Sequence, residues 1–397
     1  MHFDLVIVGG GLVGASLAAS LQDQSLTVAL IDAKMPTNND PRLFALNQTS
    51  CQFLENLQIW PQLENLAAPI HEVHVSQRKQ FGAVRLRARD VDLPVLGYVI
   101  PAFHIETALN EKLQTLQQVT CFRPAVLTEL QQETINNELQ HRLTIKMQNE
   151  TVTITTPLIV GADGADSTVR RLLQMEADTV NYEQIAIVTR TRLQRSHQHI
   201  AYERFNSHGA IAMLPLINNE CATIWTADNK EGEALFAMSD DDFLKALQAN
   251  FGYRLGRMLS IDKRHRFPLK MVRAKESVRA GAILLGSAAH ALHPIAAQGF
   301  NLALYEVAVL AESLQKGLPV DLQQVNANIQ NQINTSVSVS HRLSSLFADS
   351  SPLIKHLLPL GLVGMDKLPV MRRSFINKML GRSGHIPSLL LSASEND

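Results

Sequence analysis

Three short segments of this chain combine glycine turns with acidic or small polar residues before helical patterns, an arrangement suited to binding phosphates. The first is GGGLVG, where Gly9, Gly11 and Gly14 follow the apolar run LVIV. In that setting Gly9 allows a tight turn, Gly11 lets the backbone approach a pyrophosphate, and Gly14 lets helix and strand pack closely. Because unpaired N–H groups at a helix start attract phosphate, we expect Leu12 and Val13 to contribute to the same site.

An acidic residue completes this first pattern. Asp32 ends the apolar run LTVALID, 18 residues after Gly14. An acid in this position accepts hydrogen bonds from a ribose. Lys34 is the only basic residue beside it, which favours a ribose without a 2′-phosphate, as in FAD or NAD. Glycines at this spacing also occur in plain packing turns, but strand, glycines, helix and acid together predict a dinucleotide site.

The second segment, PLIVGADGADSTVRRLL, again ends a strand-like run in a glycine turn. Asp163 lies between two glycines, the second of which is Gly164, and Arg170 follows at the opening of a helix. An ordinary loop capped by Asp166 or Ser167 would explain part of this pattern. It would not explain an acid flanked by glycines and followed by an arginine, so we interpret the segment as a further part of the binding site.

The third segment, AILLGSAAHALHPIAAQGFN, repeats the passage from strand to turn to helix. Gly286 ends the strand-like run, Pro294 stiffens the loop, and Gly299 and Asn301 precede a long helical pattern. A turn of this kind directs backbone N–H groups towards an electron-rich group.

Histidines and cysteines in the chain do not indicate a metal centre or a disulfide framework. His290 and His293 lack an evident third ligand nearby, so hydrogen bonding within their loop is favoured over metal binding. Cys51, Cys121 and Cys221 are odd in number and far apart, which suits a reducing cytosol.

Composition limits the class of protein. The 397 residues are 46% hydrophobic and 18% charged, which allows a large core and one or two domains. The net charge of −1 gives no global attraction to nucleic acid. The opening apolar run is interrupted by glycines and reads as a buried strand, not a signal peptide. We expect no transmembrane helix.

The three motifs, in this order, resemble those of the FAD-dependent aromatic hydroxylases of the p-hydroxybenzoate hydroxylase type. The similarity extends over nearly the whole chain, and DPRLFALN resembles a further segment of that family. The resemblance implies that residues of all these segments bind FAD. They are Gly9, Gly11, Leu12, Val13, Gly14, Asp32, Arg42, Asp163, Gly164, Arg170, Gly286, Ser287, Pro294, Gln298, Gly299, Phe300 and Asn301.

The family implies an α/β fold, with a Rossmann-like FAD-binding domain, an inserted, mostly antiparallel β substrate domain and a helical C-terminal region. Alternating apolar patterns from about residue 180 to 275 suit the inserted sheet. We expect a discontinuous FAD-binding domain, a substrate domain in two pieces and a C-terminal part. Their ranges are 1–75, 98–178 and 275–335 for FAD binding, 76–97 and 179–274 for the substrate domain, and 336–397 for the C-terminal region.

Other segments resemble the ubiquinone-biosynthesis branch of this family. LHPIAAQGFNLAL and HVSQR carry that similarity, and FGYRLG and LFADSSPLIKHLLPLGL are most similar to the subgroup that hydroxylates 2-polyprenyl-6-methoxyphenol. The resemblance implies that NAD(P)H reduces FAD, that O2 forms a flavin C4a-hydroperoxide, and that a polyprenyl phenol is hydroxylated to the 1,4-benzoquinol. A sister enzyme acting at another ring carbon and a non-catalytic flavin-fold subunit remain alternatives.

Two positions depart from the family pattern. Ser287 stands where an Asp usually contacts the ribityl chain, and Ala297 stands where a glycine is frequent. A serine hydroxyl keeps one such hydrogen bond, and alanine at a position of positive φ costs about 1 kcal/mol. We expect both changes to be compatible with FAD. His290, His293 and Pro294 are the catalytic candidates of this loop, the two histidines as possible bases for the phenol and Pro294 as the wall beside the flavin ring.

The C-terminal region carries a basic pattern. Between residues 367 and 394 five basic residues and no acid are interleaved with apolar ones. This pattern suits an amphipathic helix at anionic lipid, and an ordinary solvated helix explains it equally well. We expect a cytoplasmic protein, with peripheral contact to the inner face of the membrane and with other ubiquinone-biosynthesis proteins as further partners. The five residues are Lys367, Arg372, Arg373, Lys378 and Arg382.

Overall fold

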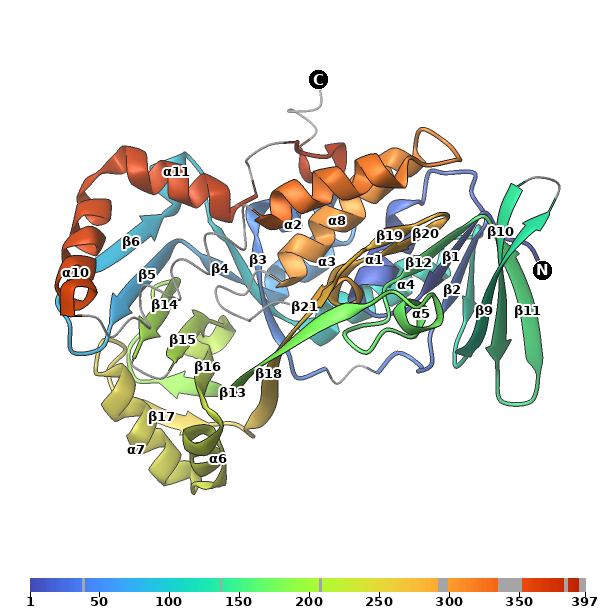
Figure 1. Ribbon diagram of the computed structural model, residues 1–397. Helices are drawn as coiled ribbons and strands as arrows, with labels where there is room; N and C mark the ends of the chain where they lie inside the picture. Colours follow the sequence, from blue (N-terminus) through green and yellow to red (C-terminus); the bar gives the residue numbers. More distant parts are fainter. Residues whose placement is uncertain are drawn as a thin grey trace.

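The computed structural model describes residues 1–37, 40–135, 138–206, 209–291, 299–334, 352–381 and 385–392. Its two large β-sheets lie in opposite halves of an elongated molecule, and two long strands of one sheet run towards the other (Figure 1). A small three-stranded sheet lies between them. Its strands, in spatial order, are β3 (Leu43–Asn47), β7 (Gly97–Pro101) and β4 (Ala68–Ile70).

The first large sheet has six strands and is parallel except at one edge, where β19 pairs antiparallel to β20. Parallel strands of this kind are covered on both faces and therefore read as continuous apolar runs. The spatial order is β19 (Val278–Arg279), β20 (Ala282–Leu284), β12 (Leu158–Gly161), β1 (Leu5–Val8), β2 (Val28–Ile31) and β8 (Val119–Phe122).

Alternate residues of β1 pack into two hydrophobic cores, one on each face of the sheet. Leu5 and Ile7 pack into a cluster with the helices, whereas Val6 and Val8 pack towards a three-stranded antiparallel sheet on the opposite face. That sheet consists of β9 (Val126–Ile135), β10 (Glu138–Lys146) and β11 (Thr151–Thr156). The helical layer contains α1 (Leu12–Ser20), α2 (Gln48–Asn56), α3 (Trp60–Leu63), α4 (Ala102–Gln114), α8 (Gly299–Leu314) and a helix over residues 322–334.

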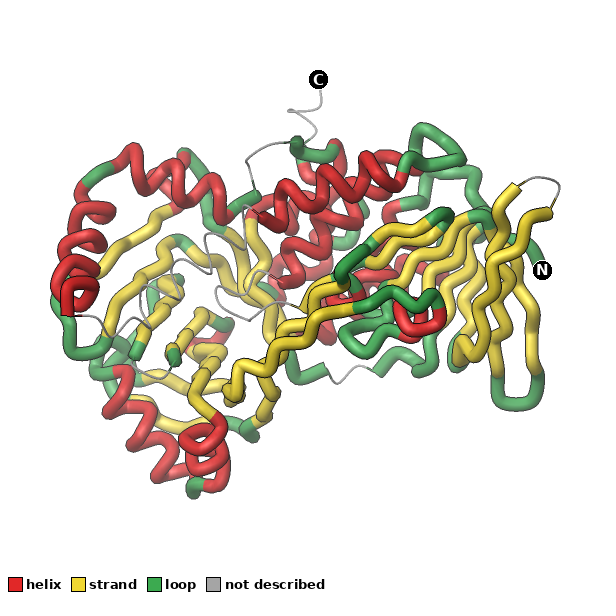
Figure 2. The backbone as a smooth tube through the Cα atoms, in the orientation of Figure 1, coloured by secondary structure: helices red, strands yellow, loops and turns green. Residues whose placement is uncertain are grey.

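The second large sheet has nine strands and is antiparallel except for the pair β5–β14. Figure 2 shows its two longest strands, β13 and β18, extending towards the first sheet. The spatial order is β21 (His290–Ala291), β18 (His265–Ala274), β13 (Ala177–Leu193), β16 (Glu220–Asp228), β15 (Ala210–Pro215), β14 (Ile200–Phe205), β5 (Glu72–Gln77) and β6 (Ala83–Arg87), with β17 (Met258–Ile261) paired to β13.

The two faces of this sheet also have separate cores. On one face Trp225 and Met213 pack with a helical pair, through Leu235 of α6 (Asn229–Ala237) and through Phe243 and Phe251 of α7 (Asp240–Phe251). On the other face Val75 and Phe205 pack with residues of β7 and of two C-terminal helices. These helices are α10 (Pro352–Lys367) and α11 (Pro369–Met379).

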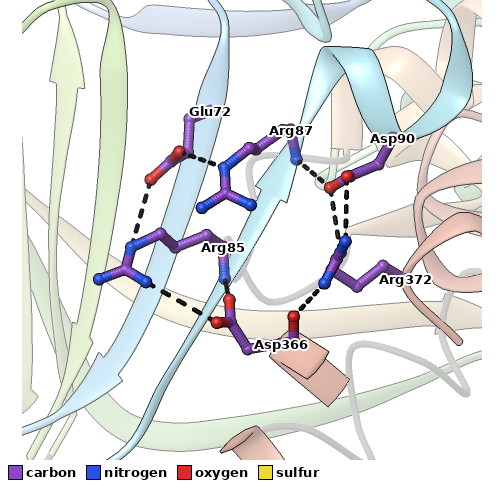
Figure 3. Close-up of polar contacts among 6 residues, drawn as sticks. All are labelled: Glu72, Arg85, Arg87, Asp90, Asp366 and Arg372. Atoms are coloured by element: carbon purple, nitrogen blue, oxygen red, sulfur yellow. Dashed lines mark hydrogen bonds and ion pairs between the residues drawn. The ribbon is translucent and has the colours of Figure 1, made fainter. Parts of the chain in front are cut away.

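The C-terminal helices attach to the edge of the nine-stranded sheet through ion pairs (Figure 3). Arg372 forms two hydrogen bonds to Asp90, at 3.1 and 3.2 Å, and both side chains are only 10% exposed. Asp366 accepts from the backbone N–H of Arg85 at 2.9 Å, and its backbone oxygen accepts from Arg372. Arg87 in turn donates to Glu72 at 2.9 Å. The network joins α10 and α11 to β5, β6 and the turn that follows β6.

The predicted organisation into a parallel sheet, an antiparallel sheet and a helical C-terminal part is present. The exact domain ranges remain predictions, and strand β5, Glu72–Gln77, spans the predicted boundary at residue 75. Two of the five basic C-terminal residues, Arg372 and Arg373, are paired with Asp90 and Asp92, and Arg382 lies outside the described residues. Within the described ranges, no helix has both the length and the apolar character needed to cross a bilayer.

Candidate functional site

The predicted site residues follow four adjacent strands of the six-stranded sheet. Gly9 comes after β1, Asp32 after β2, Asp163 after β12 and Gly286 after β20. These strands are neighbours in the order β20, β12, β1, β2, and all three pairs are parallel. Because the carboxyl ends of parallel strands meet at one edge, the fold gathers four separate parts of the sequence at one place, where α/β proteins bind ligands.

The glycines of the first loop have different roles. Gly9 has a φ of +103°, and a Cβ there would lie 2.4 Å from the backbone of Ala162. A Cβ on Gly14 would lie 1.9 Å from the carbonyl oxygen of Gly9. The fold itself therefore requires both glycines. A Cβ on Gly11 would meet no heavy atom within 4 Å, so the open space beside Gly11 is available to a ligand.

Helix α1 begins at this loop without a side-chain cap among the described residues. Its first backbone hydrogen bond runs from Ala15 N to Gly11 O at 2.9 Å. The N–H groups before Ala15, those of Leu12 and Val13 among them, therefore have no partner within the helix. They lie at its positive end, a position suited to a pyrophosphate.

Asp32 shapes the loop as well as offering acceptors. One carboxylate oxygen accepts from the N–H of Gly10 at 2.7 Å and the other from the N–H of Lys34 at 2.9 Å. Each oxygen of a carboxylate has a second lone pair. Asp32 therefore holds the glycine loop in place and keeps acceptor capacity for a ribose hydroxyl.

Asp163 has one oxygen engaged and one without a partner. Oδ2 accepts from the N–H groups of Thr168 at 2.6 Å and Val169 at 3.2 Å, at the start of α5 (Thr168–Leu172). Ser167 is the N-cap of the same helix and accepts from Arg170 N at 3.0 Å, as the simpler interpretation of this segment expected. Oδ1 of Asp163 is buried without a hydrogen-bond partner. Such an atom costs free energy unless a ligand satisfies it.

Two arginines connect the loops to one another. Arg170 donates to the carbonyl oxygens of Ala165 at 2.6 Å and Ala288 at 2.7 Å, and so joins the second loop to the third. Arg123, which sequence reasoning missed, donates to the carbonyl oxygen of Gly10 at 2.7 Å. Arg123 lies after β8, outside all three motifs, so only the strand order brings it to the glycine loop.

The third loop lies directly against the first. Gly286 has a φ of +56°, and a Cβ there would lie 3.1 Å from Val13. Ser287 follows in a single helical turn, Gly286–Ala288, and its side chain is exposed. The hydroxyl of Ser287 is thus presented on the open side of the loop, where the resemblance placed a contact to the ribityl chain.

His290 has a buried acidic partner that the sequence did not reveal. Its Nε2 is hydrogen-bonded to Oε1 of Glu306, which is 1% exposed and lies in α8. The other oxygen of Glu306 accepts from Gly286 N at 2.7 Å. Burial alone would lower the pKa of His290, but the charge of Glu306 and the hydrogen bond to it raise that pKa above its ordinary value. Glu306 lies among the buried, mostly apolar residues of α8. An acidic residue at such a position was the feature of the sequence that could have indicated its role.

The start of α8 is tied to the small central sheet. Asn301 donates to the carbonyl oxygen of Ala45 at 2.8 Å and accepts from Asn47 N at 2.9 Å. The ring of Phe300 lies 4.8 Å from that of Phe44. The side chains of Asn301 and Phe300 therefore position the helix, whereas Gly299 has open space where a Cβ would be.

The remaining predicted residues are less informative about the site. Arg42 is paired with Asp40 at 2.5 Å, and its side chain is 54% exposed. Gly164 has a φ of +85° and open space beside it. His293, Pro294 and Gln298, together with the departure at Ala297, lie outside the described residues. Among the residues that the structure does describe, no group of three or more His, Cys, Asp or Glu side chains is arranged to hold a metal ion.

These residues fit a dinucleotide. The unpaired N–H groups of α1, the open space at Gly11 and Gly164, the acceptors of Asp32 and the unpartnered oxygen of Asp163 all lie around the same edge of the sheet. The donors suit a pyrophosphate and the acceptors suit sugar hydroxyls.

Comparison with known proteins supports this interpretation. The family model described as an FAD binding domain matches residues 2–319. The ubiquinone hydroxylase UbiL of Rhodospirillum rubrum is 28% identical over 393 residues, covering 95% of this chain and 89% of that protein. The 3-demethoxyubiquinol 3-hydroxylase of Escherichia coli is 25% identical over 402 residues, covering 95% of this chain and 98% of that protein.

Solved structures share the fold. The p-nitrophenol 4-monooxygenase PnpA of Pseudomonas putida has a TM-score of 0.79 and 17% sequence identity, covering 96% of this chain and 99% of that one. At this identity the likeness concerns the fold alone, and it confirms the predicted class, a Rossmann-like FAD-binding domain combined with an inserted antiparallel sheet.

Proposed function

We propose a specific reaction for this chain, which belongs to the FAD-binding-domain family and is an FAD-dependent monooxygenase. The reaction is hydroxylation of the ring of a polyprenyl phenol in ubiquinone biosynthesis. The substrate we propose is 2-polyprenyl-6-methoxyphenol, and the product is the corresponding 1,4-benzoquinol. The observation that carries the proposal is the convergence of the three glycine-containing loops on one sheet edge, in a chain whose full-length relatives are named ubiquinone-pathway hydroxylases.

The overall reaction consumes the phenol, O2, NAD(P)H and a proton, and yields the hydroxylated ring, NAD(P)+ and water. The chemistry supplied by bound FAD is uptake of a hydride from NAD(P)H and activation of O2 for insertion of one oxygen atom. The N–H groups of Leu12 and Val13 would hold the pyrophosphate, Asp32 the adenosine ribose, and Asp163 and Ser287 the flavin side of the cofactor.

The protein's own contribution is position and exclusion of water. Glu306 accepts a hydrogen bond from the N–H of Gly286 and is hydrogen-bonded to the ring of His290, and these two contacts fix the position of the third loop. We assign His290 the role of a positioning residue, because its Nε2 is occupied by Glu306 and it is 7% exposed. A buried ring held in this way orients the loop, and a phenol does not reach it.

An apolar face is available for the prenyl tail. The side chains of β15 alternate between the two faces of the sheet and therefore pack into two different cores. Ile211 and Met213 pack with the α6–α7 layer, whereas Ala210 and Leu214 face the cluster that also contains residues of β7 and α11. We propose that the second face, which adjoins the small central sheet, borders the tail.

Deletion of the gene tests the reaction most directly. We expect lipid extracts of the deletion strain to accumulate 2-polyprenyl-6-methoxyphenol, and the wild-type gene to remove it. The purified FAD-bound protein should oxidise NAD(P)H faster when this phenol is added and should transfer one atom of 18O from 18O2 to the ring. Unchanged ubiquinone, with no precursor and no phenol-stimulated oxidation, would contradict the proposal.

A sister reaction at another ring carbon is the second candidate. It is favoured by the names of the relatives, since one of them hydroxylates 3-demethoxyubiquinol. The same mass spectra separate the two, because accumulation of a demethoxyquinone or of a polyprenylphenol identifies another step. In that case the flavin chemistry stands and the substrate is revised.

A further inference from the structure

A cavity lies at the junction of the nine-stranded sheet and the C-terminal helices. Its volume is about 490 Å³, and strands β5, β6 and β14 and the end of α10 contribute its walls. None of the loop residues that follow β1, β2, β12 or β20 lines it. Its charged lining consists of four cationic side chains and one carboxylate, namely Arg85, Arg204, Arg254, Lys367 and Asp366.

Most of this positive charge is uncompensated. Asp366 is shared with Arg85, at 3.7 Å, and its other oxygen accepts from the backbone of Arg85. Among the described residues, the side chains of Arg204, Arg254 and Lys367 have no hydrogen-bond or ion-pair partner, and the Nε of Arg204 is buried. A buried guanidinium donor without an acceptor is costly unless a ligand satisfies it.

A buried histidine near the cavity, His74, is affected by the same positive charges. His74 is directly opposite Arg85 and Tyr202 in the sheet, so these side chains share a face with Arg204. His74 is buried, and neither of its ring nitrogens has a partner. Burial first, and then the charges of Arg254, Arg85 and Arg204, lower the pKa of His74 to about 4. His74 is therefore neutral at physiological pH and adds no further charge to the site.

We propose that this cavity binds a phosphate group, held by the guanidinium groups of Arg204 and Arg254 together with Lys367. Arginine forks match phosphate oxygens in geometry and charge, and the open volume admits a group larger than a single ion. The proposal does not depend on the reaction assigned to the flavin site.

Titration of the FAD-bound protein with inorganic pyrophosphate, followed by calorimetry at constant ionic strength, tests the site. We expect saturable binding that weakens about tenfold in Arg204→Gln and in Arg254→Gln. Arg89→Gln is the matched control, because Arg89 is exposed and outside the cavity. Arg254 is also exposed, so its substitution leaves the fold intact. Equal affinity in the wild type and in both cavity variants would overturn the proposal.

A second arm identifies the source of the phosphate. Exposed apolar residues, among them Leu368 and Val370, follow Lys367 at the rim, so a lipid headgroup and a free phosphate metabolite are both sterically accessible sources. Vesicles of phosphatidylcholine with and without phosphatidylglycerol distinguish them. If the Arg204→Gln/Arg254→Gln protein loses binding to the anionic vesicles, the ligand is a headgroup. If vesicle binding is unchanged while pyrophosphate binding is lost, the ligand is a small phosphate-bearing metabolite. Loss of neither kind of binding refutes the site.

Discussion

The dinucleotide edge and the attachment of the C-terminal helices both bury charge, but they use it differently. At the dinucleotide edge, Glu306, Arg170 and Arg123 bind backbone groups of the loops. At the C-terminal attachment, Arg372 and Asp90 bind each other. Charges directed at backbone groups fix loop shapes and leave donors and acceptors free for a ligand. In the Arg372–Asp90 pair the two charges hold α11 to the turn after β6, and neither side chain is left for a ligand.

This difference predicts different responses to mutation. Damage at the first region should appear as loss of FAD, and damage at the second as loss of stability without a change in cofactor affinity. Within the first region, residues required by the fold should also be separable from residues required only by the ligand.

The largest effect is expected for Gly14→Ala. Its Cβ would lie 1.9 Å from the carbonyl oxygen of Gly9, so helix α1 must move away from β1, at a cost of about 3 kcal/mol or more. Gly11→Ala is the matched variant, because its Cβ meets no protein atom within 4 Å. We expect Gly14→Ala to lose both stability and FAD, and Gly11→Ala to lose FAD alone. Thermal unfolding of the apoprotein and flavin absorbance measure the two quantities, and equal destabilisation would contradict the distinction.

Arg372→Ala should destabilise the fold by about 3–5 kcal/mol, because it leaves Asp90 buried without its partner. Arg373→Ala removes a neighbouring ion pair, to Asp92, in which both side chains are exposed, and should cost about 0–1 kcal/mol. Denaturant unfolding measures both values. The FAD dissociation constant should be the same in the two variants, and a large change in it for Arg372→Ala would show that the two regions are coupled.

Glu306→Gln should cost about 1–3 kcal/mol and should change the dependence of stability on pH. The pKa of His290 is higher in the folded protein than in the unfolded chain. Its ion pair is therefore fully stabilising below the unfolded pKa, about 6.5, and the stabilisation is lost as pH rises through the folded value. The free energy of unfolding should therefore be higher in the wild type than in the variant, and this difference should be larger at pH 6 than at pH 9. A constant difference would show that His290 does not titrate with Glu306.

The smallest effect is expected for Ser287→Ala. Loss of one hydroxyl that faces the ligand should weaken FAD binding by about 0.5–1.5 kcal/mol, measured by fluorescence titration of the apoprotein. Ser260→Ala, in an exposed position of β17, is the control and should leave the affinity unchanged. Identical FAD affinity in both variants would remove Ser287 from the binding site.

The sequence was most informative where residue type and backbone geometry are linked. The glycine turns, Asp32 and the alternating pattern of the inserted sheet follow local rules, and the predicted α/β class and FAD-dependent activity are confirmed. Arg123 and Glu306 were missed, because their roles depend on strand order and helix packing and not on spacing along the chain. The basic C-terminal pattern was ambiguous for a similar reason, since only the fold places Asp90 beside Arg372.

The order of strands has a consequence for synthesis of the protein. Strand β20 pairs with β12 across more than a hundred residues of intervening chain, and Glu306, which fixes the third loop, comes later still. A nascent chain that ends before residue 282 therefore exposes one edge of β12 to the solvent. Non-local pairing of this kind is slow and leaves intermediates open to aggregation. We therefore expect the site edge to be complete only after Glu306 has been synthesised, and flavin uptake to be a late event in the maturation of this protein.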